Sequence, residues 1–447
     1  MKKYIYLLPV LFSTLLSCNY LDREPIGQVI PETASDFRAL LTTAYQTFPS
    51  HKNLLTVRAD EVDMDFLAAA YDGYKDIATW NDETADWKTY SFPYVSMYQT
   101  IFYANHIINA GPDVTPDAGE SIKQVMAEAY CLRAYAHFEL VNLYAQPYNQ
   151  ATAKTDRGVV ISYTVDIAQD HKPAKVQEVY DQIWADIQKA DELMETEAQQ
   201  PTLRYRFSKQ SLAALKSRIA LYQADWTKTL EYAREGLAMN NSLENLNDSD
   251  AVNPAQFKSK ECLLSLERVT NQDLNSIDFY ISSKLTSAYD KENDKRFELF
   301  FKKQYGDYFN KKFASNTDRL TFRVAELYLN AAEAAAQLGN EADAKQYLTE
   351  LAKNRLNEAG LTTYTDRLNA ATGNTLIEEI YTERLRELAL EGTRWYDLRR
   401  TTRPAISKML MNPATFEPEF YSLDQNDKRY TLPFPKEAIQ SNPNLQD

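Results

Sequence analysis

The sequence predicts a predominantly α-helical fold, and three observations support this prediction. Apolar residues recur at helical spacing in long stretches at 98–109, 127–147, 176–193, 324–339 and 376–400. Two stretches repeat a helix, a tight turn at a small residue and a second helix. Hydrophobic residues make up 44% of the chain and charged residues 25%, as in folded soluble proteins. The 447 residues can bury a large core, either in several domains or in one intertwined unit.

Residues 1–17 have the composition of an export signal. Lys2 and Lys3 precede an apolar run, 4–16, that is too short for a permanent transmembrane helix. The motif LLSC, which ends at Cys18, resembles the cleavage site of bacterial lipoproteins. We therefore expect a lipoprotein signal peptide at 1–17 and a mature chain that starts at an acylated, membrane-anchored Cys18. The alternative is an ordinary secretory signal in which Cys18 is incidental.

Particular residues in the helical stretches predict where helices begin and how they pack together. In 127–147, the small residues Ala129, Ala134 and Ala136 allow another helix to approach closely. Pro173 precedes the stretch 176–193, as suits a helix start. The two repeats, 220–233 and 335–348, are similar to tetratricopeptide helix-turn-helix units but lie far apart in the chain. They therefore predict degenerate helical hairpins that stack into a curved scaffold with a shared core.

The stretch 376–400 places three glutamates beside an apolar stripe. Glu383, Glu387 and Glu391 are four residues apart, so their charges would repel along one helix face. Compensating cations are available at Arg384, Arg386 and Arg394. One interpretation is a solvated amphipathic helix. We favour the other, a helix packed between neighbours whose Glu and Arg side chains form a shared ion-pair network that stabilises the fold.

The charge, the cysteines and the histidines argue against several kinds of site. A net charge of −14 disfavours nucleic acid as a partner, since phosphate binding needs a basic face. Cys131 lies within a helical pattern and is expected to be a small buried residue, although a bridge to Cys262 is chemically permitted. We predict no metal and no cofactor, because no metal-ligand spacing joins His51, His106, His137 and His171 to one another or to the cysteines.

Several motifs resemble the SusD/RagB family of nutrient-uptake outer-membrane lipoproteins, whose namesake binds starch. The most specific is ERLRELALEGTRWYDLRR, at 383–400, which matches the family pattern ER-x-x-EL-x-x-EG-x-R-W-x-DLRR. The stretches 127–147 and 324–339 and the closing motifs LPFP and NPNL, at 432–435 and 442–445, agree with it in order. The resemblance implies one SusD-like unit at 18–447 with tetratricopeptide-like helical hairpins. We expect its scaffold mainly at 26–65, 95–239 and 320–400, loop-rich variable insertions at 66–94 and 240–319, and a C-terminal segment at 401–447.

The resemblance also implies a function. Proteins of this family are lipid-anchored at the outer membrane, pair with a SusC-like TonB-dependent transporter and capture oligosaccharides, or peptides in some members. We therefore expect a non-catalytic, surface-exposed glycan-binding protein. A peptide-binding member is the main alternative. A glycoside hydrolase on a helical scaffold is another, but it would need two carboxylates that face each other across a cleft.

The insertions supply the candidate ligand-binding residues. Residues 67–94 interleave aromatic rings with carboxylates, lack a convincing apolar stripe and are rich in turn formers, so we expect a loop there. The apolar face of a sugar stacks on an aromatic ring, while carboxylates and amides bind its hydroxyls. From composition and chain position, the candidates are Asp72, Tyr74, Trp80, Trp87 and Tyr280.

Overall fold

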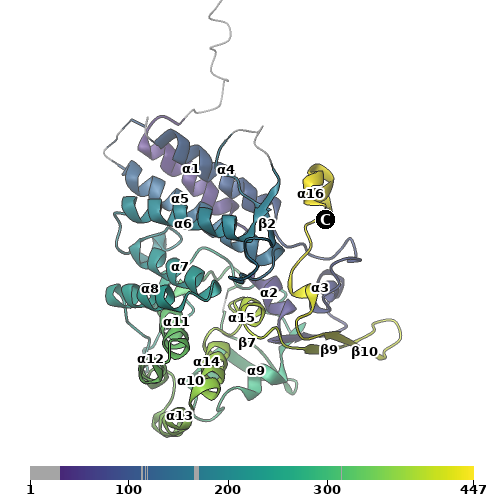
Figure 1. Cartoon of the computed structure of the whole chain (residues 1–447). Coiled ribbons are helices and arrows are strands. Elements are labelled where there is room, and N and C mark those ends of the chain that lie inside the picture. The colour runs from purple at the N-terminus through teal and green to yellow at the C-terminus, as the bar shows by residue number, and fades with distance from the viewer. Residues whose placement is uncertain are drawn as a thin grey trace, which may run out of the picture.

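The structure is a computed structural model that describes residues 31–111, 114–115, 117, 119–165, 171–313 and 315–446. The predicted signal peptide and Cys18 lie outside these residues. Helices dominate and follow one another across the molecule, as Figure 1 shows. The predicted helical fold class is therefore confirmed. None of the helices in the described part of the chain is long and apolar enough to cross a membrane.

The N-terminal part of the scaffold is a layer of packed helices. Helix α5 (Ile122–Tyr144) packs against α4 (Val95–Ala110) and α6 (Val176–Leu193), and α1 (Ala34–Thr47) packs against α4 (Figure 1). The side chains of Ala129, Ala134 and Ala136 on α5 are completely buried. Alanines at these positions allow the neighbouring helices to approach the α5 backbone closely.

The two predicted repeats are helical hairpins. Helix α7 (Lys209–Tyr222) pairs with α8 (Trp226–Met239), and α11 (Val324–Gln337) pairs with α12 (Glu341–Lys353). Each turn contains a residue with positive φ, 54° at Ala224 and 80° at Gly339. Helices α8 and α11 also pack together, so the two hairpins, distant in sequence, are neighbours in space. This arrangement confirms the prediction of stacked hairpins.

The stretch 376–400 forms two helices instead of the single one expected. Helix α14 (Gly373–Glu387) ends near Leu388, and α15 (Arg394–Arg400) begins after a turn. Gly392 has φ 70°, and a Cβ atom built there would lie 2.5 Å from Cβ of Lys52, on α2 (Lys52–Arg58). The helix therefore breaks where α2 approaches too closely for any residue but glycine. Before the break, α13 (Glu358–Ala370) leads into α14.

Small elements complete the structure. Short helices occur at α3 (Tyr71–Ala78), α9 (Ser283–Ser287), α10 (Lys295–Phe300) and α16 (Lys436–Ser441). Antiparallel strand pairs are β1 (Val62–Met64) with β5 (Phe279–Ile281), β2 (Arg157–Val160) with β3 (Pro173–Lys175), β4 (Cys262–Leu264) with β8 (Phe322–Arg323), β6 (Phe301–Gln304) with β7 (Asp307–Asn310), and β9 (Ile406–Met411) with β10 (Pro418–Leu423).

The loop expected at 67–94 is wrong in part, because residues Tyr71–Ala78 form helix α3. Its buried residues include Tyr71, Tyr74, Ile77 and Ala78, which lie at helical spacing. That stripe is only two turns long, and it includes Tyr74, which we predicted as a ligand-binding ring and which is a core residue.

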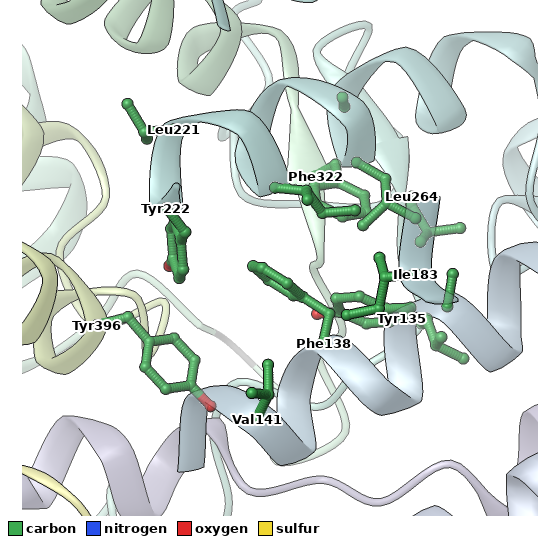
Figure 2. Close-up of a cluster of buried hydrophobic side chains, with 14 of the residues drawn as sticks. Tyr135, Phe138, Val141, Ile183, Leu221, Tyr222, Leu264, Phe322 and Tyr396 are labelled. Atoms are coloured by element: carbon green, nitrogen blue, oxygen red, sulfur yellow. The ribbon is translucent and has the colours of Figure 1, made fainter. Parts of the chain in front are cut away.

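Two clusters of buried apolar side chains hold the fold together. The larger one lies among the scaffold helices, and Figure 2 shows part of it around Tyr135 and Phe138 of α5. The rings of Phe48 and Tyr135 stack there with centroids 5.2 Å apart. The smaller cluster packs the insertions against the scaffold and includes Tyr74, Phe279, Phe297 and Phe300. Cys131 lies in the first cluster and Cys262 in the second, and both are free thiols, so the permitted bridge is not formed.

Candidate functional site

A cleft of about 1470 Å³ opens between α3 with its following loop and the C-terminal segment. In Figure 1, α3 and the segment that leads to α16 lie on the same side of the molecule. One wall includes Asp72, Asp76, Asp86 and Lys88, and the other includes Tyr144, Arg157, Arg429 and Phe434. The cleft thus joins one predicted insertion to a part of the chain where we predicted no ligand contact.

Asp76 on α3 fixes the loop that follows the helix. One of its carboxylate oxygens accepts a hydrogen bond from Nδ2 of Asn81 at 2.8 Å. The other accepts from the backbone N–H of Asp86 and from the Thr89 hydroxyl, both at 2.7 Å. A carboxylate with three donors from three loop positions pins the loop to the helix, so the residues between them are held in place.

Trp87 projects from this pinned loop. Its side chain is 88% exposed, and it stands between Asp86 and Lys88, which both line the cleft. Lys88 reaches back to the exposed carboxylate of Asp72 with a 2.7 Å ion pair. The Trp87 ring therefore faces solvent on this loop, between two residues that line the cleft, and Asp72 lines the cleft as well.

Trp80 does not project into solvent, and the expectation that its ring contacts ligand needs correction. The side chain is completely buried, and its indole N–H donates to the carbonyl of Arg58 at 3.0 Å. Arg58 in turn forms a bidentate pair with Asp82, at 2.8 and 2.7 Å. The Trp80 ring cannot stack on a sugar while it is buried; instead it anchors the base of the loop that carries Trp87.

Tyr74 is also a core residue and not a ligand contact. Its ring is completely buried and lies edge-on to Phe279, with centroids 5.0 Å apart. Its hydroxyl donates to Asp273 at 3.0 Å and accepts from Asn271 at 2.7 Å. Burial holds the pKa of Tyr74 well above its usual value. Tyr74 therefore ties the first insertion to the second.

Tyr280 is half-buried on β5 and does not line the cleft. It pairs with Asp63 across the β1–β5 ladder. Burial and the carboxylates of Asp63, Asp307 and Asp65 raise the pKa of Tyr280 to about 12. The five predicted ligand residues therefore do not converge: Asp72 and the buried Trp80 line the cleft, Trp87 is exposed next to it on the loop, Tyr74 is buried, and Tyr280 lies elsewhere.

The opposite wall contains rings that we did not predict as site residues. Tyr144 and Phe434 stack with centroids 5.8 Å apart, and the Arg157 guanidinium lies 4.9 Å from the Phe434 ring centroid. Lys428 of this segment pairs with Glu83 of the loop at 2.9 Å, which links the two walls through an exposed ion pair. Phe434 belongs to the motif LPFP, so the motif marked this segment although it gave no sign of a cleft.

Glu387 is at the centre of a buried ion-pair network beside the turn between α14 and α15. Its carboxylate pairs with Arg296 at 2.7 Å, Arg323 at 2.5 Å and Arg355 at 2.9 Å. Burial alone would raise the pKa of Glu387, but the guanidinium groups of Arg355, Arg323 and Arg296 outweigh it and hold the pKa well below its usual value. The cations predicted for the network were Arg384, Arg386 and Arg394, so none of these three arginines was expected as a partner of Glu387.

The remaining predicted members of the network have their own partners. Glu383 pairs with Arg296 and with Arg386, both at 2.6 Å. Glu391 pairs with Lys312 at 2.6 Å and Arg323 at 2.9 Å. Arg384 contacts Asp397 at 3.0 Å, and Arg394 contacts Asp60 at 2.8 Å. These groups balance one another's charge inside the protein.

A second buried ionic cluster also went unpredicted. His51 Nε2 lies 2.9 Å from Glu139, and ligand atoms of His51, Glu139 and Glu267 all lie within 4.8 Å of one another. Lys52 Nζ lies 3.0 Å from Glu139 and 3.5 Å from Glu267. The Lys52 ammonium thus already supplies the positive charge that these carboxylates need, and we regard the cluster as structural.

Comparisons with known proteins agree with this architecture. Residues 19–221 match a SusD-like family described as starch-binding and associating with the outer membrane, and residues 267–447 match the SusD family. The whole chain is 25% identical to a SusD-like protein of Formosa agariphila and covers 99% of it.

Solved structures share the fold. A SusD superfamily protein from Bacteroides thetaiotaomicron superimposes with a TM-score of 0.74 at 20% identity, over 92% of this chain and 98% of that one. A laminarin-binding SusD-like protein gives a TM-score of 0.63 at 20% identity, over 83% and 92% of the two chains. With both family models matched in order and the helical-hairpin scaffold in place, the chain belongs to the SusD/RagB family.

Proposed function

We propose that this protein is a non-catalytic glycan-binding lipoprotein of the cell outer membrane. It captures oligosaccharide in the cleft beside Trp87 and delivers it to a partner TonB-dependent transporter. The observation that carries the proposal is an almost fully exposed indole on a pinned loop, whose neighbours Asp86 and Lys88 line a large polar cleft.

The chemistry of the cleft suits a polyhydroxylated ligand. A sugar ring can lay its C–H face on Trp87, as apolar faces do on aromatic rings. Asp72, Asp86 and Lys88 offer acceptors and donors for hydroxyl groups on the same wall. Acidic and basic side chains both line the cleft, which favours a neutral ligand there over a strongly charged one. The starch-binding description of the matched family and the laminarin-binding relative support a glycan over a peptide.

Membrane attachment through an acylated Cys18 completes the proposal. The matched family is described as associating with the outer membrane, which supports this location. A Cys18→Ala variant is expected to move from the membrane fraction to the soluble fraction. Retention of that variant in the membrane would contradict the lipid anchor. Delivery to the transporter predicts that the two proteins are recovered together from detergent-solubilised membranes.

The ligand-binding test compares purified protein with its Trp87→Ala variant in native gels that contain starch or laminarin. We expect the protein to be retarded and the variant to lose most of that retardation, because the stacking ring contributes about 1–3 kcal/mol. Phe420→Ala removes another ring that is 80% exposed and serves as the matched control. Equal retardation of all three proteins would exclude Trp87 as the contact.

The same gels distinguish glycan binding from glycan hydrolysis and from peptide binding. Release of reducing sugar from a retarding polysaccharide would make the protein a hydrolase and overturn the non-catalytic assignment. Absence of retardation by any polysaccharide, with an unchanged melting temperature, would move peptide binding to first place. Peptide titrations of the same samples then decide that alternative.

A further inference from the structure

A second groove, of about 620 Å³, shares no lining residue with the cleft beside Trp87. It is formed by the C-terminal half of α1, by the 3-10 helix Pro201–Leu203 with the turn that follows, and by a loop at 315–319. Its volume is in the range of pockets that hold small ligands. Together with Phe257 and residues 265–266, these parts build a second concave surface that the proposed function does not use.

Three aromatic residues line this groove: Tyr45, Tyr205 and Phe257. Phe257 is 41% exposed, and Nη1 of Arg204 donates to its backbone carbonyl at 2.7 Å. Tyr205 is half-buried and lies edge-on to the buried ring of Tyr45, with centroids 5.5 Å apart. The groove therefore has an apolar side with fixed rings on which a flat ligand face can rest.

Polar groups with unused hydrogen-bonding capacity lie on the same groove. Gln46 and Thr202 are exposed, and their side chains make no hydrogen bond within the described ranges. Asp318 is already engaged, since its carboxylate accepts the backbone N–H of Ser315 at 3.0 Å. An amide and a hydroxyl next to two rings are the combination that binds a sugar: stacking for its apolar face and directed donors and acceptors for its hydroxyls.

Two arginines lie at one end of the groove, next to the carboxylate of Asp318. Arg319 lines the groove, and its backbone forms a bridge with that of Arg268. Arg319 donates to the carbonyl of Leu266, and within the described part of the chain neither arginine forms an ion pair. Burial and the charge of Arg268 lower the pKa of Arg319, as expected for two adjacent cations. Two guanidinium groups without an ion pair can bind an anionic group of a ligand.

We infer that this groove binds an acidic saccharide residue, one that bears a carboxylate or a sulfate. The C–H face of the sugar rests on Phe257 and Tyr205, and the acidic group accepts hydrogen bonds from Arg319, with Arg268 adding charge. This inference rests on the proposed glycan-binding function and refines it: neutral segments of a polysaccharide bind at the cleft, and acidic residues bind here.

The test uses purified full-length protein in affinity gels with two matched pairs of polymers. Polygalacturonate is compared with its fully methyl-esterified form, and dextran sulfate with dextran. We expect retardation by at least one acidic polymer and much weaker retardation by its neutral counterpart. Phe257→Ala and Arg319→Gln should each weaken the acidic interaction about tenfold, since hydrogen bonds to charged groups and stacked rings are of that size. Binding of polygalacturonate would identify a carboxylate as the acidic group, and binding of dextran sulfate would identify a sulfate.

Further variants separate binding from folding. Arg268→Gln changes a side chain that makes no ion pair in the described residues, so it should keep the melting temperature and still weaken acidic binding. Arg367→Gln removes a similarly exposed arginine from α13, paired with Glu379, and is the matched control that should change nothing. Acidic binding that is unchanged in Phe257→Ala, Arg319→Gln and Arg268→Gln but lost in Trp87→Ala overturns the inference and leaves the cleft as the only site. Failure to bind any polymer, neutral or acidic, overturns the proposed function and this inference together.

Discussion

Glu387 shows most clearly how single residues hold this fold together. It is completely buried, and three guanidinium groups from separate parts of the chain converge on its carboxylate. Buried charges of this kind do not necessarily stabilise a protein more than apolar residues of the same shape. Removal of one partner is nevertheless costly, because it leaves the others charged and unpaired in a medium of low dielectric constant.

The first prediction concerns that carboxylate. Glu387→Ala should lower the free energy of unfolding by about 3–5 kcal/mol, because Arg296, Arg323 and Arg355 would lose their common partner. Glycan affinity of the folded fraction should not change, since Glu387 lines neither proposed site. Chemical denaturation and gel retardation measure the two quantities. Glu350→Ala is the control, as Glu350 is half-exposed and pairs only with Lys353 one helical turn away. An unchanged stability in Glu387→Ala would contradict the structural role of the network.

The second prediction concerns Glu61, which is completely buried before β1. One carboxyl oxygen accepts the backbone N–H of Leu390 at 2.7 Å, and the other has no partner. Burial raises the pKa of Glu61 to about 8. Between its ordinary pKa, near 4.5, and about 8, the folded state therefore binds one more proton than the unfolded state. The contribution of Glu61 to stability is complete below the lower value and is lost as the pH rises through this window.

The experiment compares Glu61→Gln with the unchanged protein from pH 5 to pH 8. Glutamine is neutral and can still accept from Leu390, so the variant should gain stability relative to the unchanged protein as the pH rises. The difference should grow by at most about 1.4 kcal/mol per pH unit. Glu350→Gln, with an exposed carboxylate, should show no such trend. A stability difference that is constant with pH would contradict a proton on Glu61.

Single elements are shaped by their neighbours as much as by their own pattern. The turn between α14 and α15 contains Leu390 with φ 63° and Gly392 with φ 70°. Gly392 packs directly against the backbone of Lys52, and its neighbours Glu391 and Arg394 reach Lys312 and Asp60. The turn thus places α15 against α2, and its charged side chains contact residues in two other parts of the chain.

A third prediction follows for Gly392→Ala. The added Cβ would lie 2.5 Å from Cβ and 2.7 Å from the carbonyl oxygen of Lys52, in addition to the cost of a positive φ. We expect a loss of about 2–4 kcal/mol, as the sum of backbone strain and overpacking. Gly339→Ala has φ 80° and nothing within 4 Å of the added Cβ, so it measures the backbone cost alone. Equal losses in the two variants would show that the contact with Lys52 has no effect.

The loop after α3 illustrates the same dependence at the cleft. Its rings looked equivalent in the sequence, yet Trp80 is buried beneath the loop and Trp87 is displayed on it. Asp76 and the pair of Arg58 with Asp82 set this difference by fixing the two ends of the segment. The proposed loss of glycan binding in Trp87→Ala is therefore specific to one position in the loop.

The whole molecule is connected by contacts between parts that are distant in sequence. The network around Glu387 and its neighbours joins residues near 60, 296, 323, 355 and 387. Phe92 and Tyr421 pack against both apolar clusters. These links agree with the expectation that residues 18–447 form one unit, which remains a prediction.

The fourth prediction tests this at the scale of the molecule. Differential scanning calorimetry should give one unfolding transition, and circular dichroism and tryptophan fluorescence should report the same midpoint. Glu387→Ala should move the entire transition, because its partners lie in different parts of the chain. Two resolved transitions, only one of which moves in Glu387→Ala, would falsify the single unit.

Much of the scaffold was accessible from the sequence alone. Helical periodicity is a local property, so the stretches at 98–109, 127–147, 176–193 and 324–339 were assigned to helices that the structure contains. The hairpin turns at Ala224 and Gly339 were found because small residues mark tight turns. The motif at 383–400 identified the family. These conclusions need only neighbours along the chain, or a pattern of residue types in a fixed order.

Only the tertiary structure decided which side chains meet. The arginines at 296, 323 and 355 became the partners of Glu387 because packing brings their elements together, and nothing in the local sequence marks them. In the same way, Tyr74 and Trp80 entered the core while Trp87 stayed in solvent. Burial depends on surfaces contributed by residues far along the chain, such as Phe279 against Tyr74. The sequence by itself thus determined the scaffold and the family, and long-range packing decided where a ligand can bind.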